Sequence, residues 1–256
     1  MEREIRDMIF KHHVYNVQKY LWTLFLYTVS ALPIAFLIYV EIYIQVMLTR
    51  GVYVGNKFAA VYSYLFILIG IVFIGETYLY YGFLRNIIEA LKILGYNPKL
   101  YHRVFLVLGI TISIVNIVCG LYLLQNIGDL GRYIGSIAHP KNILGSIVRL
   151  PWLFGRHIFF NTYYIINTIL LFASAVYVSL TLMKISRYVG SKLLRIISLV
   201  VLANGIILLL YVYVIVDPIL TNLVIELFAG ITIVLGFYSF RLTRRLYEIF
   251  SSRCGG

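Results

Sequence analysis

The stretch VFLVLGITISIVNIVCGLYLLQ, residues 104–125, contains no charged side chain. Its 22 residues, coiled as an α-helix, cover the roughly 30 Å of hydrocarbon in a bilayer at about 1.5 Å per residue. In water a helix with apolar side chains on every face would have to be buried all round. The stretch therefore predicts a transmembrane helix.

Five further stretches have the same character, and none of the six contains a Lys or Arg. Hydrophobic residues make up 61% of the 256-residue chain and charged residues 12%, which is more apolar surface than a soluble domain can hide. The sequence predicts an all-α integral membrane protein, a six-transmembrane-helix bundle that forms one membrane domain over residues 21–240. The expected spans are residues 21–48, 58–84, 104–125, 158–183, 196–216 and 219–240.

Lys and Arg are distributed unevenly among the segments that join these spans. Of the 22 basic residues, 16 lie before the first span, between the second and third, between the fourth and fifth, and after the sixth. Basic segments remain on the cytoplasmic side during insertion. We therefore expect a multi-pass protein of the cell (plasma) membrane with both termini cytoplasmic and a basic tail at 241–256. The net charge of +12 follows mostly from this bias, and does not by itself indicate nucleic-acid binding.

Two amphipathic segments border the expected spans. Residues 1–20 carry Ile5, Met8 and Ile9 on one helical face, which predicts a cytoplasmic interfacial helix leading into the first span. Residues 85–95 continue the second span with apolar residues at 87, 88, 91 and 94. They are interpreted either as a helix end lying on lipid headgroups or as a coupling helix that docks a cytoplasmic partner.

Polar residues inside the spans are the candidate functional residues. Measured by helical rise, Glu41, Asn116, Asn167, Asn204 and Glu226 all fall about 10 to 18 Å below the outer boundary, which predicts a common polar layer. A charged carboxylate at that depth costs at least a few kcal/mol unless it finds water, a partner or a proton. No expected span offers a Lys, Arg or His as that partner.

Three interpretations of this layer stay open. The amides can form a purely structural network between helices. Alternatively, Glu41 and Glu226 can carry a proton or cation, or the polar side chains can contact other subunits. Glu76 differs from these residues, because it lies about 27 Å from the outer boundary, nearer the cytoplasm.

The long outer loop, residues 126–157, is basic on the side of the membrane where positive charge is normally depleted. Its bases are Arg132, Lys141, Arg149 and Arg156, and its only acid is Asp129. Such a loop attracts an anionic solute or a polymer such as nucleic acid. The alternative interpretation is a loop that rests on anionic lipid headgroups.

The sequence lacks the residue patterns that membrane enzymes use. All five histidines lie outside the expected spans, so no histidine is available there as a haem ligand or as the base of a serine hydrolase. The chain contains neither a His-Glu-x-x-His helix nor a Gly-rich phosphate loop followed by Lys. We expect no enzymatic activity, no cofactor and no metal site, and we expect any ATP energy to come from a separate chain.

Two functions from different classes are consistent with these features. The first is a membrane subunit of a translocation or import apparatus, part of a conduit for an anionic solute or a polymer such as DNA, energised by a separate ATPase. The alternative is a self-sufficient proton- or cation-coupled secondary transporter or channel that uses Glu41 and Glu226. The expected partners are the lipid bilayer, other membrane subunits, a cytoplasmic ATPase and an anionic substrate. A homo-oligomer would also satisfy the carboxylates across a subunit interface.

The import function predicts that the outer loop is essential. Replacing Arg132, Lys141, Arg149 and Arg156 together by Gln removes the charge that attracts the anion. Uptake of labelled DNA by cells carrying this variant should fall at least tenfold, while the amount of protein in the membrane stays the same. Uptake at the wild-type rate would contradict the import function.

Overall fold

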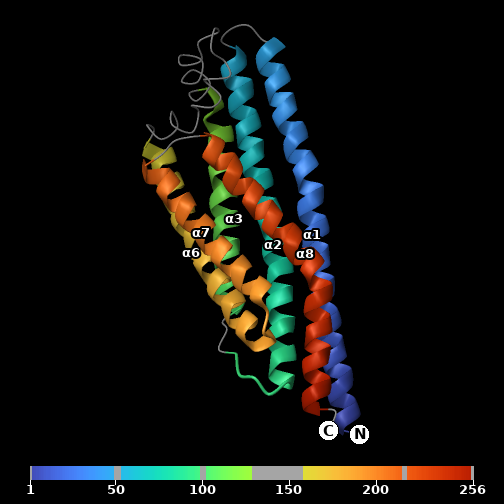
Figure 1. Cartoon of the computed structure of the whole chain (residues 1–256). Coiled ribbons are helices and arrows are strands. Elements are labelled where there is room, and N and C mark those ends of the chain that lie inside the picture. The colour runs from blue at the N-terminus through green and yellow to red at the C-terminus, as the bar shows by residue number, and fades with distance from the viewer. Residues whose placement is uncertain (1, 49–52, 99–101, 129–157, 215–217, 255–256) are drawn as a thin grey trace.

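The computed structural model describes residues 2–48, 53–98, 102–128, 158–214 and 218–254, which are almost entirely helical. The helices run up and down in sequence order, and both termini lie at one end of the bundle (Figure 1). They are α1 (Glu2–Leu48), α2 (Tyr53–Ile93), α3 (His102–Gln125), α6 (Ile158–Val189), α7 (Lys192–Val214) and α8 (Pro218–Cys254). The all-α prediction is confirmed.

Three helices in the described part of the chain are long and apolar enough to cross a membrane. They are Phe66–Ile93, His102–Gln125 and Ile165–Val189. These segments overlap the second, third and fourth expected spans, which supports a membrane protein. The first, fifth and sixth spans include side chains outside the described part of the structure, and they stay predictions.

Helix α3 turns its most apolar face away from the protein. Val107, Ile114 and Val118 are 63%, 54% and 54% exposed. Gly109 and Asn116 are buried on the opposite face. A helix in water would have the reverse arrangement, whereas helices in lipid contact one another through small and polar residues. The surface of α3 is therefore that of a membrane helix.

Buried residues recur along the helices in alternating steps of three and four. In α1 they are Phe10, Val14, Val17, Leu21, Leu24 and Thr28. In α3 the same steps connect Phe105, Gly109, Ile112, Asn116, Cys119 and Leu123, and Ser113 and Gly120 are buried next to them. Steps that alternate between three and four residues are typical of left-handed helix packing, in which crossing angles are near +20°. Each helix packs beside its neighbours in the chain, and α8 packs against α1 to close the bundle.

Glycine lets α2 and α3 approach until backbone touches backbone. A Cβ atom added at Gly120 would lie 2.6 Å from the carbonyl oxygen of Ser63, and one added at Gly70 would lie 2.8 Å from that of Ser113. No side chain larger than hydrogen fits at these distances without moving a helix. The α2–α3 contact therefore depends on glycine at both positions.

Helix α1 places aromatic rings on glycines of both its neighbours, α2 and α8. The pairs are Tyr20 with Gly82, Tyr27 with Gly75 and Phe25 with Gly236. Each ring occupies the space that a Cβ atom would need. This packing holds α1 between α2 and α8.

Contacts between helices mark one level across the bundle, which we call the basal level. The ring of Tyr81 lies 5.3 Å from that of His102, where α3 begins. The Tyr238 hydroxyl donates to Ser191 Oγ at 2.5 Å, in the turn between α6 and α7. The Trp22 ring lies 5.5 Å from that of Phe240, which places α1 and α8 at the same height.

Three helices continue past the basal level and pack together as a stalk, formed by residues 2–19, 85–93 and 241–254 (Figure 1). The Phe10 ring stacks on Phe250 at 4.3 Å, and both belong to the hydrophobic core or pack against it. Residues 2–19 are continuous with the first span, in one helix of 47 residues.

The structure corrects the interpretation of residues 85–95. Ile87, Ile88 and Leu91 are at most 2% exposed, because they face the interior of the stalk. Their apolar face therefore does not lie on headgroups or against a separate partner, and docking of a partner on another face of this segment stays a prediction. Periodicity identified the buried face but not what covers it.

The glycine contact predicts opposite effects for two identical substitutions. Gly120→Ala should destabilise the protein by about 1–3 kcal/mol, because the new methyl group meets backbone. Gly230→Ala should be neutral or stabilising by up to about 1 kcal/mol, because nothing lies within 4 Å of its Cβ position in α8. Thermal unfolding of both variants in the same detergent checks this, and equal melting temperatures would contradict it.

Candidate functional site

Two of the expected polar residues meet inside the bundle. Asn116 Nδ2 of α3 lies 3.4 Å from Asn167 Oδ1 of α6, and it donates to the Ile112 carbonyl at 2.8 Å. Asn116 is only 3% exposed. The pair therefore links two helices of the bundle through side-chain amides.

The position of Asn116 explains the role of this pair. It occupies one of the buried positions that recur in steps of three and four along α3. A polar residue at such a position disfavours any register that leaves its amide without a partner. The Asn116–Asn167 contact therefore favours one axial alignment of α3 with α6.

Asn204 is buried at a different height. A Cβ atom at the adjacent Gly205 would lie 2.7 Å from Cβ of Ala175, so Asn204 is level with that part of α6. Ala175 lies eight residues beyond Asn167, or about 12 Å along the helix. The structure brings Asn116 and Asn167 together and places Asn204, 1% exposed, nearer the basal level.

The other members of the expected sites fall outside the described side chains or residues. Glu41 and Glu226 belong to α1 and α8, but nothing is described of their side chains. The bases of the outer loop lie outside the described residues altogether: Arg132, Lys141, Arg149 and Arg156. Their roles stay predictions.

Glu76 lies at the contact between α1 and α2. The adjacent Gly75 is covered by the Tyr27 ring, whose hydroxyl donates to the Val72 carbonyl at 3.3 Å. The Glu76 side chain is half-buried there and close enough to Tyr27 to interact with it electrostatically. The carboxyl group is thus part of a helix contact, away from the Asn116–Asn167 pair.

Exposed bases lie close to the basal level on all six helices, a grouping that sequence reasoning did not identify. They are Lys19, Arg85, Arg103, Arg187, Lys192, Arg195 and Arg241. Counting bases per segment placed them on one side of the membrane. Only the contacts between helices bring them to a similar height in space.

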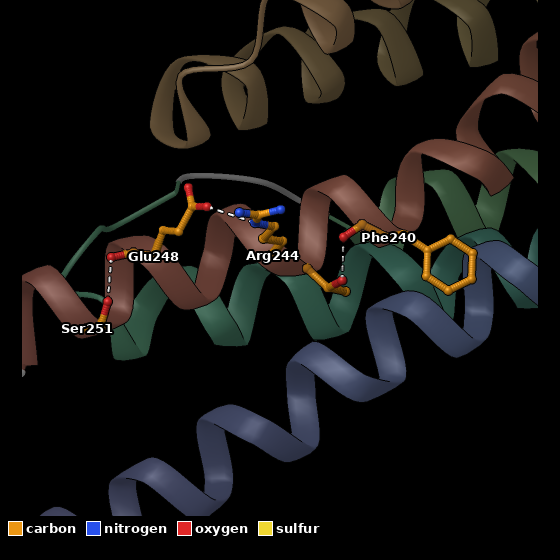
Figure 2. Close-up of polar contacts among 5 residues, drawn as sticks. Phe240, Arg244, Glu248 and Ser251 are labelled. Carbon is orange, nitrogen blue, oxygen red and sulfur yellow. Dashed lines mark hydrogen bonds and ion pairs between the residues drawn. The ribbon is translucent and has the colours of Figure 1, made fainter.

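The surface of the stalk carries short ion pairs between neighbouring turns. Asp7 and Lys11 approach to 2.6 Å, and this hydrogen bond raises the pKa of Lys11. Arg244 and Glu248 lie 3.2 Å apart on α8, where Ser251 Oγ donates to the Glu248 carbonyl (Figure 2). Exposed pairs of this kind contribute little stability, so packing holds the stalk together.

Contacts join α1 to α2 at three positions of α1 that are seven residues apart, two of them polar and one through a ring. Arg6 donates to the carbonyl of Ile93, the last residue of α2. A cation at this end of a helix interacts favourably with the helix dipole. His13 Nδ1 lies 2.9 Å from Asn86 Oδ1. Seven residues further along α1, the Tyr20 ring packs over Gly82 of α2. The seven-residue spacing was present in the sequence, but its partners on α2 were not.

Within the described ranges, no group of three or more His, Cys, Asp and Glu side chains is arranged to hold a metal ion. No family model, no curated protein and no solved structure matches this chain. Its function is therefore inferred from its own residues.

The amide contact predicts a specific pattern of coupling. Asn116→Leu and Asn167→Leu should show a coupling of about 0.5–1.5 kcal/mol in a double-mutant cycle, because either change alone breaks the bond. Asn116→Leu and Asn204→Leu should be additive within about 0.5 kcal/mol, because these residues are at different heights. The free energy of unfolding in detergent, measured for each variant, gives the coupling energy in both cycles. Equal coupling energies would instead indicate that Asn116, Asn167 and Asn204 form a single layer.

Proposed function

We propose that this chain is a membrane subunit of a translocation or import apparatus in the plasma membrane. In this proposal it spans the bilayer six times, with both termini cytoplasmic, and forms part of a conduit for an anionic solute or a polymer such as DNA. A separate cytoplasmic ATPase supplies the energy. The observation that supports it best is the stalk.

The stalk extends further than membrane anchoring requires. Eighteen residues of α1 precede the basal level, which corresponds to about 27 Å of helix, in addition to the roughly 20 residues that cross a bilayer. The stalk has its own core, in which Phe10, Leu91 and Leu246 are fully buried. A packed three-helix extension of this kind is suited to transmit force between a soluble partner and the membrane helices.

The tip of the stalk also leaves apolar side chains uncovered. Ile5, Met8, Ile9 and Tyr15 of α1 are 45%, 65%, 44% and 63% exposed. Beyond the basal level no acyl chains are expected to cover them. Grouped apolar side chains on an aqueous surface are typical of protein–protein contacts. We assign this face of α1 to docking of the ATPase.

The charges support an anionic cargo. The outer loop carries four bases, and the basal level carries a base from every helix. A polyanion drawn to the outer loop would meet positive charge again at the cytoplasmic end.

The alternative function, a self-sufficient transporter, gains less support from the described helices. Asn116 donates to Asn167 and to the Ile112 carbonyl, which favours a structural role for the pair over a proton or cation pathway. This alternative rests on Glu41 and Glu226, whose side chains are outside the description.

Two substitutions close together in the stalk distinguish a loss of partner docking from a loss of stability. Met8→Glu places a charge in the exposed face, so labelled DNA uptake should fall at least tenfold with an unchanged melting temperature. Phe10→Ala removes a fully buried ring and should lower stability by about 3–5 kcal/mol. Cell uptake assays and thermal unfolding of the purified variants check both outcomes.

Two results would contradict the proposal. One is normal uptake by cells whose chain carries Met8→Glu. The other is ion flux through proteoliposomes that contain this chain alone and lose the flux on Glu41→Gln or Glu226→Gln. The second result would establish the self-sufficient transporter instead.

A further inference from the structure

We infer that the corner between α6 and α7 binds an anionic phospholipid. Arg187, Lys192 and Arg195 would hold the headgroup phosphate, and the apolar surfaces of the same two helices would hold the acyl chains. This site does not include the stalk, and its three bases are among those of the basal level.

The corner is a rigid turn. Gly190 adopts a positive φ of 68°, and the Ser191 N–H donates to the Ser186 carbonyl at 3.0 Å, which closes the end of α6. Ser191 Oγ then accepts the Leu194 N–H at 3.2 Å and caps the start of α7. The Tyr238 hydroxyl donates to the same oxygen at 2.5 Å and ties the turn to α8. The bases on either side of the turn are therefore presented by a fixed backbone.

The charge at this corner is all of one sign. Arg187, Lys192 and Arg195 are exposed, and no Asp or Glu occurs in the chain from residue 130 to residue 216. On the neighbouring helices, Glu89 pairs with Lys92 and Glu248 with Arg244. The bases of the corner thus lack a carboxylate from their own hairpin, and a phosphate would provide the missing counter-charge.

Apolar side chains continue from the bases on the outward faces of both helices. On α6, Leu180 is 54% exposed and lies seven residues before Arg187, on the same face. On α7, Ile196 and Leu199 are 57% and 51% exposed and follow Lys192 and Arg195. A molecule that fits has a phosphate at the basal level and hydrocarbon running away from it along the helices. A phospholipid has both parts, whereas nucleic acid and free phosphate lack the hydrocarbon.

The test uses the purified full chain in mild detergent with added phosphatidylglycerol or phosphatidylcholine. Lipid affinity is measured by native mass spectrometry, and the melting temperature is measured in parallel. Phosphatidylglycerol should bind at least tenfold more tightly than phosphatidylcholine and raise the melting temperature. Inorganic phosphate at the same concentration should not raise it.

Two triple variants with the same loss of charge locate the site. The corner variant, R187Q/K192Q/R195Q, should lose at least tenfold in phosphatidylglycerol affinity. The stalk variant, K11Q/R244Q/R245Q, should stay within twofold of the wild type. Equal losses in the two variants would overturn the proposal, because binding would then follow total charge. Unchanged phosphatidylglycerol binding in the corner variant would also overturn it. So would equal binding of the two lipids together with displacement of the lipid by a short DNA oligonucleotide.

Discussion

Apolar side chains gain little by leaving lipid for the surface of another helix, so membrane helices associate where their surfaces fit closely. In this protein the fit depends on glycine. The hydrogen atoms of Gly70 and Gly120 let α2 and α3 touch backbone to backbone. The rings of Tyr20 and Tyr27 rest on α2 for the same reason. The place of α1 and the height of the basal level both follow from these contacts.

One packing pattern continues from the bundle into the stalk. The buried steps of α3 include Gly109, Asn116 and Cys119, while those of the α1 stalk are Phe10, Val14 and Val17. Small and polar residues hold helices together in lipid, whereas large apolar residues do so in water, where their burial is favourable. The helices therefore keep one register across the basal level, and above it Gly109, Asn116 and Cys119 occur beside large residues such as Ile112 and Leu123. This continuity would let a movement of the stalk reach the membrane helices.

Depth along a helix was enough to predict some contacts and not others. Asn116 and Asn167 were expected at the same depth, and they meet. Asn204 was assigned to that layer by counting from the outer end of its span. Its height is set instead by the turn at Gly190, which places Gly205 opposite Ala175. Counting residues assumes that all helices end at one level, whereas helices joined by a tight turn take their register from that turn.

The sequence alone determined that the chain is helical, that it contains membrane spans and that its bases gather in alternate segments. These properties belong to single segments, because a backbone in lipid has to satisfy its own hydrogen bonds and each segment carries its own hydropathy and charge. Only the tertiary structure decided that the apolar face of residues 85–93 is buried in a stalk and that bases from six helices lie close to one level. Both depend on which faces meet between segments distant in the chain, and that is decided by the shapes of the side chains in contact.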